Sequence, residues 1–511
     1  MFTENIYKTY YCDVAVVGGG VGGCAAAIEA ARKGMRVTLF EKGVSLGGLA
    51  TNGFVPSVAG NIEGIALEFV RKLKEIGQID DSFREDGFRN ALFEPEYGKI
   101  VLEDMVYEAG SRIVYDSTLI YAEVEDHNIT RAIFYTKSGY MAVKAKIFID
   151  ATGDGDLAAL AGVPYEIGGQ EFAGLNIAST LGSRWANVNL VKYAEANSKF
   201  IQEQKDQGVE HPRELAAALQ DIAIEKGELT RRVGSKRMFF KLPLPNTPED
   251  NADIVTYAFH SYYTHCTDPI DITRQVLEQH QLMKQFHAFL KKYVPGYENV
   301  RLVGLGNIPG ARESRHVFGE YMLKGYDIAC GTKFEDGIAR FPEMFDVHHP
   351  TNEDWFFIRH IHIPEPAGSA VCEEEHVGVD CDAKIHPFGI PAGVPARSNP
   401  RDYCDIPYRC LLPQEIDNML CAGRCCSADF HATGAMRIIA PAMGTGMAAG
   451  IAASIAVNED VRPRDIDGVR VRELMIADGV PLDEPPAGYW KILREKDGEL
   501  RINMGDAISI V

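Results

Sequence analysis

The chain has 511 residues and a formal net charge of −20, with 46% hydrophobic and 24% charged residues. This length allows two or three domains with cores of their own, and the composition is typical of a globular protein. The negative charge disfavours nucleic acid and anionic membranes as partners. No apolar stretch reaches the roughly 18 residues of a membrane span, and residues 1–10 lack the apolar core of a secretory signal. We therefore expect no membrane span and a cytoplasmic location.

The first predicted unit is a strand, a turn, a helix and a second strand. Asp13–Val17 is an apolar strand, and the loop after it fits G-x-G-x-x-G with Gly18, Gly20 and Gly23. The first glycine allows a tight turn, the second lets a pyrophosphate approach the backbone, and the third brings helix and strand together. Glu41 follows the second strand, where an acid binds a ribose hydroxyl and disfavours a 2′-phosphate. The pattern predicts a dinucleotide site for FAD or NAD rather than NADP.

The next elements follow in chain order from the same apolar and glycine patterns. The sequence predicts helices over 22–33, 64–76, 100–109 and 157–162 and strands over 36–40, 113–115, 118–124, 131–136 and 144–150. From residue 163 charged helices take over, with helices predicted over 189–207, 213–227 and 272–293 and strands over 237–242, 252–259 and 355–363. The last predicted elements are a strand over 418–423 and helices over 441–457 and 469–478.

This order predicts an α/β protein whose Rossmann-type domain is discontinuous in sequence. Its N-terminal part is expected over 11–162 and its return segment over 405–460. An inserted α+β substrate or cap domain is expected over 163–404, and a helical C-terminal tail over 461–511.

The 11 cysteines are odd in number and several fall in apolar segments, which favours reduced core thiols. Cys421, Cys425 and Cys426 do not have the spacing of an iron–sulfur site. The pairs His348-His349 and His360-x-His362 lack a third ligand at matching spacing. We expect no metal site.

Four blocks together carry a resemblance to a known family. They are Asp13–Gly23 with Glu41-Lys42, the loop Leu46–Thr51, the segment Ile149–Asp156, and Asn418–Arg424 with the helix after Pro441. A fifth block is Gly310–Tyr321. The chain resembles the FAD-dependent oxidoreductase family, within the group of glutathione-reductase-like and fumarate-reductase-like flavoproteins. This resemblance implies a glutathione-reductase-like fold and FAD as the cofactor.

The resemblance also assigns residues to the parts of FAD. In this assignment the first loop binds the pyrophosphate and ribose, residues 48–51 lie near the flavin ring, and 151–153 lie near the adenine and pyrophosphate. Residues 444–446 begin a helix whose positive end would stabilise reduced flavin; close helix packing is the alternative for these glycines. The expected cofactor-binding residues are Gly18, Gly20, Gly22, Gly23, Glu41, Lys42, Gly48, Leu49, Ala50, Thr51, Ala151, Thr152, Gly153, Asp156, Gly423, Gly444, Thr445 and Gly446.

Two departures from the wider group bear on the cofactor. Arg424 stands where that group often has an acid that binds the ribityl chain, and residues 46–53 contain no His or Cys for covalent attachment. We therefore expect non-covalent FAD. A second complete G-x-G-x-x-G is missing, so an external electron donor or acceptor is expected as a partner.

Four residues are candidates for the chemistry. Spacing predicts a helix after Gly310 with Arg312 and His316 on one face, where they could hold an anionic or polyhydroxylated substrate; a solvated polar face is the alternative. This helix, within 300–330, could face the flavin. His431 could accept a proton and Arg437 could stabilise an oxyanion. Structural hydrogen bonds or ion pairs are the alternatives for both.

The resulting prediction is an enzyme that transfers a hydride between a small polar substrate and flavin N5. Oxidation of an alcohol, such as a sugar hydroxyl, is the first expectation. Reduction of an activated alkene and a non-catalytic flavoprotein subunit of an electron-transfer complex are the alternatives, as is lyase activity with structural FAD. Substrate identity and oligomeric state stay open.

Overall fold

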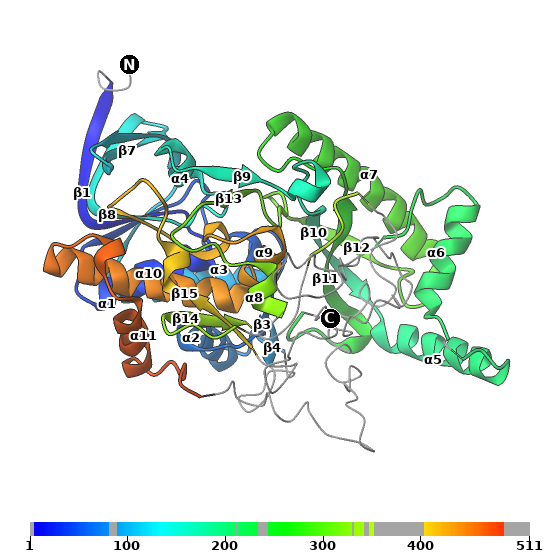
Figure 1. Ribbon diagram of the computed structural model, residues 1–511. Helices are drawn as coiled ribbons and strands as arrows, with labels where there is room; N and C mark the ends of the chain where they lie inside the picture. The colour runs from blue at the N-terminus through cyan, green and yellow to red at the C-terminus, as the bar shows by residue number, and fades with distance from the viewer. Residues whose placement is uncertain are drawn as a thin grey trace.

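The computed structural model describes residues 5–80, 89–210, 212–233, 244–329, 332–341, 347–351 and 403–484. One large sheet with its helices and one smaller antiparallel sheet with its helices lie on opposite sides of the view in Figure 1. The strands predicted over 237–242 and 355–363, and the pair His360 and His362, lie outside the described residues.

The large sheet has the strand order β5-β2-β1-β8-β7-β6, and β16 pairs with β8. Strands β5, β2, β1, β8 and β16 are parallel, whereas β8, β7 and β6 form an antiparallel meander. Val17, Phe40 and Cys421 are aligned with one another through the register, so the parallel strands end at one edge. The bounds are β1 Ile6–Val17, β2 Val37–Phe40, β5 Arg112–Val114, β6 Thr118–Glu125, β7 Asn128–Thr136, β8 Gly139–Asp150 and β16 Met419–Cys421.

The helices around this sheet come from both ends of the chain. α1 and α10 pack along each other, with α11 against α10, at the left of Figure 1. Of the described helices, only α10 is long and apolar enough to cross a membrane, and 94% of its apolar window is buried inside the protein. α10 is therefore a core helix here. The bounds are α1 Val21–Arg32, α2 Gly64–Glu75, α3 Pro95–Glu108, α4 Asp156–Leu160, α9 Phe430–Met436, α10 Ile439–Glu459 and α11 Gly468–Ala477.

The second region, residues 179–305, contains a three-stranded antiparallel sheet in the order β11-β10-β12. It has an aromatic core of its own, in which Trp185, Phe259 and Phe286 contact one another. We call it the antiparallel region. Its elements are β10 Ser179–Val188, α5 Leu190–Asp206, α6 Leu215–Glu225, η4 Glu249–Asn251, β11 Ala252–Ser261, α7 Pro269–Tyr293 and β12 Arg301–Leu305.

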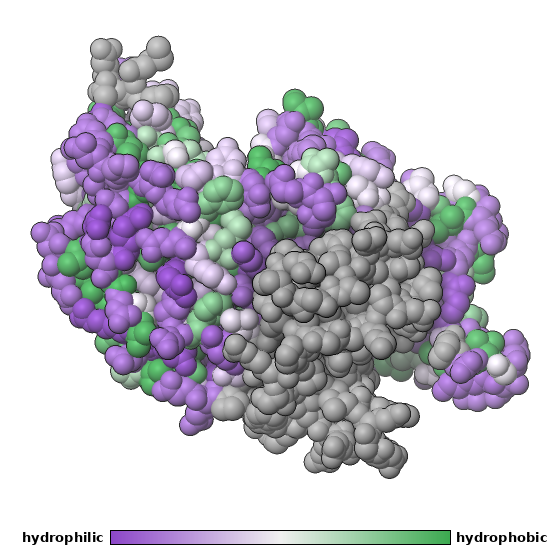
Figure 2. Space-filling model, in the orientation of Figure 1, coloured by the Kyte–Doolittle hydropathy of each residue, from purple (hydrophilic) through white to green (hydrophobic). Residues whose placement is uncertain are grey.

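Short strand pairs and turns complete the described chain. They are β3 Ser57–Gly60 with β4 Arg89–Leu92, β9 Tyr165–Ile167 with β13 Arg315–Val317, β14 Gly337–Phe341 with β15 Cys404–Pro407, the helix α8 Gly325–Ala329, and the 3₁₀ turns η2 Gly48–Ala50, η3 Gln170–Phe172, η5 Tyr408–Leu411, η6 Gly423–Cys425 and η7 Pro463–Asp465. Figure 2 shows hydrophilic residues over much of the described surface on this face, in keeping with the net charge of −20.

One of these predicted elements is wrong, and the start of one predicted helix differs at the site. The segment after Gly310 is not a helix: it is extended and includes β13, which pairs with β9. Its side chains find partners on separate elements, and these contacts override the helical spacing. The helix containing Gly444 begins at Ile439, earlier than predicted. Pro441 is tolerated there because a first-turn residue needs no intrahelical N–H bond.

Candidate functional site

The loop between β1 and α1 requires glycine at two of the predicted positions. Gly18 has φ +102°, and a Cβ on it would lie 2.4 Å from the Ala151 carbonyl oxygen. A Cβ on Gly23 would lie 2.0 Å from the Gly18 carbonyl oxygen. α1 begins after Gly20, and no side chain caps its N-terminus. Its first backbone N–H groups are therefore available to an anion such as a phosphate.

The acid after β2 is tied to this loop. Glu41 accepts a hydrogen bond from the Gly19 backbone N–H at 2.6 Å and another from the Gly43 N–H at 2.7 Å. The carboxylate is thus fixed beside the glycine loop, where the sequence predicts a ribose hydroxyl. The neighbouring Lys42 is exposed.

The loop over 46–53 lies against the first glycine loop. The Gly47 N–H donates to the Gly19 carbonyl oxygen at 2.8 Å, and a Cβ on Gly48 would lie 3.2 Å from the Gly20 Cα. Thr51 is fully buried, and its hydroxyl donates to the Leu46 carbonyl oxygen at 2.6 Å. Gly48 and Leu49 are half-buried, whereas Ala50 is buried. The structure therefore places Gly48 beside Gly20, and the Thr51 hydroxyl stabilises the loop itself. The contact of residues 48–51 with the flavin ring stays a prediction.

A buried carboxylate organises the loop after β8. Asp150 accepts hydrogen bonds from the Thr152 N–H at 3.0 Å, the Thr152 hydroxyl at 2.8 Å and the Ala158 N–H at 2.9 Å. Burial raises the pKa of Asp150, and these hydrogen bonds oppose that rise. The Thr152 hydroxyl also accepts from the Asp156 N–H at 2.8 Å. Ala151, Thr152 and Asp156 thus form one rigid turn beside Gly18.

The return segment adds a fourth loop. We call the loops over 18–23, 46–53, 150–156 and 423–425 the ring of loops. Gly423 has φ +75°, and a Cβ on Gly22 would lie 3.0 Å from the Gly423 backbone nitrogen. The Gly423 N–H donates to the Thr445 hydroxyl at 3.0 Å, and that hydroxyl donates to the Ala442 carbonyl oxygen at 2.9 Å. Thr445 is fully buried. Its hydroxyl therefore ties η6 to α10.

Two glycines of α10 pack against other elements. A Cβ on Gly446 would lie 2.1 Å from the Gly22 carbonyl oxygen, and one on Gly444 would lie 3.0 Å from the Ala339 Cβ. These contacts match the packing alternative for the α10 glycines. The role of residues 444–446 toward a cofactor stays a prediction.

Arg424 is a site residue that the expected binding set did not include. Its Nη2 lies 2.9 Å from Asp154 Oδ1, and the Ser314 hydroxyl donates to the same oxygen at 2.6 Å. A Cβ on Gly153 would lie 2.8 Å from this Nη2, so the guanidinium lies directly against that glycine. The sequence signal was an arginine where the wider group has an acid.

The extended segment 312–316 places Arg312 against the antiparallel region. Its Nη1 donates to the Ala178 carbonyl oxygen, and its Nη2 lies 3.4 Å from His260 Nε2. His260 Nδ1 lies 2.9 Å from the Ala258 carbonyl oxygen, which can only accept, so Nδ1 carries the proton. Burial and the Arg312 charge hold the pKa of His260 well below its ordinary value. Arg312 therefore faces a neutral imidazole.

Glu313 and His316 form a buried ion pair. Their side chains are 2% exposed, and His316 Nε2 lies 3.1 Å from Glu313 Oε2. Burial alone would lower the pKa of His316, but the hydrogen bond and charge of Glu313 outweigh it and raise that pKa. His316 Nδ1 lies 2.9 Å from the Ala428 carbonyl oxygen. Both ring nitrogens therefore face protein acceptors, so a proton-transfer role would require one of them to change partner.

Glu313 also accepts two hydrogen bonds from the chain entering β10. The Ile177 N–H donates to it at 2.6 Å and the Asn176 side-chain amide at 2.9 Å. Asn176 carried no motif that could have identified it, whereas Glu313 lies in the block Gly310–Tyr321 but was not singled out there.

His431 is paired with an acid that the sequence did not single out. His431 Nε2 lies 2.9 Å from Glu171 Oε1, and the two side chains are 15% and 39% exposed. Phe430 lies edge-on to both His316 and His431, so the structure brings these two candidates to one aromatic ring. Arg437 is half-buried at the C-terminal end of α9.

The described part of the chain contains no group of three His, Cys, Asp or Glu residues arranged to hold a metal ion. His348 stacks on His260 with ring centroids 4.9 Å apart, and His349 Nδ1 accepts from the Thr351 N–H at 3.1 Å. The eight cysteines within the described ranges are buried and free. Both histidines thus have packing or hydrogen-bonding roles.

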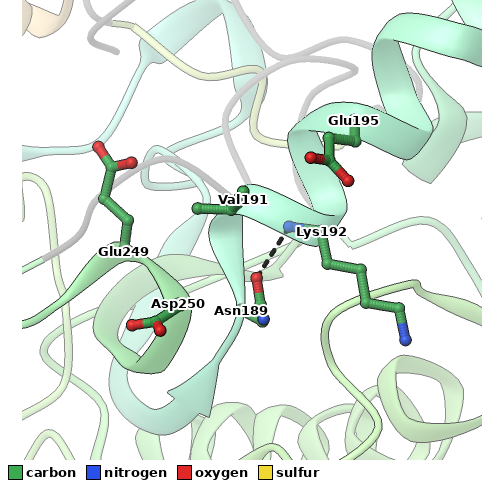
Figure 3. Close-up of a pocket in the computed structure, with 6 residues that line it drawn as sticks. All are labelled: Asn189, Val191, Lys192, Glu195, Glu249 and Asp250. Atoms are coloured by element: carbon green, nitrogen blue, oxygen red, sulfur yellow. Dashed lines mark hydrogen bonds between the residues drawn. The ribbon is translucent and has the colours of Figure 1, made fainter.

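An open depression of about 480 Å³ lies in the antiparallel region, between α5 and η4; Figure 3 shows the residues that line it. Lys192, Glu195, Glu249 and Asp250 line it together with Asn189 and Val191. Its lining contains both positively and negatively charged side chains, and none of its residues belongs to a glycine loop. We therefore place the candidate site at the ring of loops and not here.

The ring of loops, at the carboxyl edge of the sheet, fits FAD. Gly18, Gly22 and Gly23 leave no room for a Cβ, Glu41 accepts from the Gly19 N–H of the same loop, and no side chain caps the N-terminus of α1. FAD is the cofactor that these residues suit, and nothing indicates covalent attachment.

Comparison with known proteins gives both local and global matches. A segment of 59 residues is 46% identical to mitochondrial dihydrolipoyl dehydrogenase of Dictyostelium discoideum, covering 11% of this chain and 12% of that one. A segment of 176 residues is 27% identical to thiamine thiazole synthase of Pyrococcus horikoshii, covering 30% and 65%. The chain thus spans about an eighth of the first relative's length and just under two thirds of the second's.

Among solved structures, p-nitrophenol 4-monooxygenase of Pseudomonas putida is 11% identical with a TM-score of 0.42, covering 98% of this chain and 94% of that one. A geranylgeranyl bacteriochlorophyll reductase-like protein of Thermoplasma acidophilum is 13% identical with a TM-score of 0.39, covering 92% and 84%. The family model described as FAD dependent oxidoreductase matches residues 13–475. This match spans all four loops of the ring of loops, and the chain belongs to the FAD-dependent oxidoreductase family.

Proposed function

We propose that this oxidoreductase oxidises an alcohol group of a small polar molecule. The observation that carries the proposal is the pair formed by His431 and Glu171, with 2.9 Å between Nε2 and Oε1. When bound, FAD supplies an acceptor for the hydride that leaves the carbinol carbon. The reaction also releases the hydroxyl proton, and a histidine oriented by a carboxylate is suited to accept it.

In this proposal His431 Nδ1 accepts the proton. Glu171 occupies Nε2, which orients the ring and stabilises the imidazolium that forms. The C–H bond breaks as hydride leaves, the O–H bond breaks as the proton passes to His431, and a carbonyl product remains. The 15% exposure of His431 allows a substrate to reach it.

We infer that the antiparallel region acts as the substrate cap of a glutathione-reductase-like fold. The loop expected to face the flavin lies directly against this region. A Cβ on Gly182 would lie 2.1 Å from the Gly53 carbonyl oxygen, and the Asn307 N–H donates to the Asn52 carbonyl oxygen at 3.0 Å. The packing of β10 and of Asn307, after β12, on that loop supports a role of this region as a cap.

An external acceptor would then take the electrons from the flavin, since the sequence lacks a second dinucleotide motif. Alkene reduction is the second candidate, with Arg437 as a proton donor or anion anchor. Arg437 is half-buried at the end of α9, six residues after His431. This position supports alkene reduction as the alternative.

The experiment compares the two directions on the purified flavoprotein under anaerobic conditions. Bleaching of the oxidised flavin by alcohols or sugars supports the proposal. Reoxidation of the reduced flavin by enoates, without any bleaching by alcohols, contradicts it and supports alkene reduction.

The matched variants are His431→Asn and Glu171→Gln, with His127→Asn as the control. We expect His431→Asn to slow flavin reduction by about 10²- to 10⁴-fold, and Glu171→Gln to slow it less, with the flavin spectrum unchanged. His127 lies on an exposed turn with φ +62°, a conformation that asparagine tolerates. An unchanged rate and pH profile in His431→Asn would sink the assignment of His431 as base.

A further inference from the structure

Arg424 carries a buried N–H group that the protein leaves unused. Its Nη2 is paired with Asp154 at 2.9 Å, and its side chain is 15% exposed. Its Nη1 is buried and has no hydrogen-bond partner among the residues that the structure describes. A guanidinium has five donors and stays protonated, so an unpartnered buried donor is costly unless a ligand accepts from it.

Asp154 does not satisfy the guanidinium alone. Its Oδ1 also accepts the Ser314 hydroxyl at 2.6 Å. Burial acts to raise the pKa of Asp154, but the Arg424 charge and this hydrogen bond outweigh it and lower that pKa. Asp154 is therefore ionised, and it fixes one arm of the guanidinium while the other arm stays open.

The guanidinium that carries this open arm lies against the loop after β8. The guanidinium packs on Gly153, whose loop packs on Gly18 through Ala151. The residue before Arg424, Gly423, packs on Gly22 in the first turn of α1. Arg424 thus joins the two segments that flank the uncapped N-terminus of α1, where the diphosphate of a dinucleotide binds.

We propose that Arg424 donates a hydrogen bond from Nη1 to an oxygen of the FAD diphosphate, and that Asp154 is the positioning residue that orients it. An acid at this position can accept hydrogen bonds from ribityl hydroxyls, whereas an arginine can only donate. The fork of a guanidinium matches a phosphate. An arginine in place of the acid therefore contacts the diphosphate instead of the ribityl chain. The proposal concerns cofactor binding and is independent of the alcohol-oxidation proposal.

The test measures nucleotide affinity and does not depend on turnover. The full-length protein is freed of flavin, and the dissociation constants of FAD and ADP are measured for the wild type, Arg424→Lys and Arg424→Met. We expect Arg424→Met to weaken FAD and ADP alike, by about 10- to 100-fold. Arg424→Lys keeps the charge beside Asp154 but loses the second arm. Its affinities for FAD and ADP should lie between those of the wild type and those of Arg424→Met.

Arg470→Met is the control, because it also removes an arginine paired with a carboxylate, Glu459, but at an exposed site. Circular dichroism checks the fold, and Arg424→Lys serves if Arg424→Met does not fold. A loss of FAD affinity with unchanged ADP affinity would place Arg424 on the ribityl chain and overturn the proposal. Unchanged affinity for both nucleotides, including the case where only the KM for a substrate rises, would also overturn it.

Discussion

Two buried regions of the molecule differ in the residues that form them. One is the contact between α1 and α10, and the other is the segment 312–316. α1 and α10 meet through glycine and alanine, with Gly446 and Gly450 against backbone atoms of α1. The segment 312–316 meets its neighbours through charged and polar groups that are paired across long sequence separations, and Glu313 and His316 also pair with each other. The first contact depends on the absence of side-chain atoms, and the second depends on exact partners for the atoms present.

This difference has an energetic meaning. Small residues allow close helix packing at little cost, and an added methyl is penalised by overlap. A buried ion pair stabilises little relative to an apolar pair, but losing one partner leaves a charge without compensation. The four substitutions below separate these two kinds of fragility, from the largest expected effect to the smallest.

Glu313→Gln should cause the largest loss of stability, about 3–5 kcal/mol in the free energy of unfolding. It leaves the buried His316 without its counter-charge, and one side-chain oxygen is replaced by a donor facing Asn176. Denaturant unfolding measures the loss. Glu108→Gln, which removes an exposed pair with Lys72, is the control and should cost less than about 1 kcal/mol. Equal losses in the two variants would mean that burial of the pair is unimportant.

Glu29→Gln tests the one acid inside the α1–α10 contact. Burial and the Asp478 charge raise the pKa of Glu29 from 4.5 to about 7. The folded protein therefore binds more protons than the unfolded chain between these values, so stability falls as the pH rises through this window. The variant should lose that fall and gain up to about 3 kcal/mol over wild type by pH 8, since one pKa unit is about 1.4 kcal/mol.

Unfolding curves from pH 4 to pH 8 measure this effect of Glu29→Gln. Glu68→Gln, at a half-buried pair with Arg32 on the same side of α1, is the control. Parallel curves for wild type and Glu29→Gln would contradict the role of Glu29.

Gly446→Ala should cost about 2–3 kcal/mol, because its Cβ would overlap the Gly22 carbonyl oxygen at 2.1 Å. Alanine is otherwise the better helix former by about 1 kcal/mol, so the sign of the change decides between packing and propensity. In Gly304→Ala the nearest atom would lie 3.4 Å away, and we expect almost no loss. A stabilised Gly446→Ala variant would refute the close contact.

Thr445→Val should have the smallest effect, about 1–2 kcal/mol, because it leaves the Gly423 N–H without an acceptor. Thermal unfolding measures it against Thr273→Val, which removes an exposed helical hydroxyl. If both variants lose the same amount, the tie between η6 and α10 contributes nothing specific.

The parts of the fold that follow local patterns could be predicted from the sequence. The strand–loop–helix–strand unit over 13–41 agrees with β1, α1 and β2, and the glycine spacing identified the loop at Gly18. The segment after Gly310 was mispredicted because its helical spacing is real, but its partners Asn176, Asp154 and Ala428 lie more than 100 residues away.

The candidate site divides in the same way. Glycines that avoid overlap leave a signal in their own spacing, whereas the pairing of His431 with Glu171 joins residues that share no motif. The predicted catalytic roles, the domain boundaries and the external electron partner stay predictions, because each depends on groups that only meet in three dimensions.

The late position of α10 also has a consequence for how the chain is made. α1 is synthesised about 400 residues before the helix that covers it. At typical rates of translation this delay lasts roughly 20 to 80 s, and throughout that time the alanine face of α1 has no partner. Nascent chains that stop before α10 should therefore remain bound to chaperones, and release should coincide with the emergence of residues 439–459 from the ribosome.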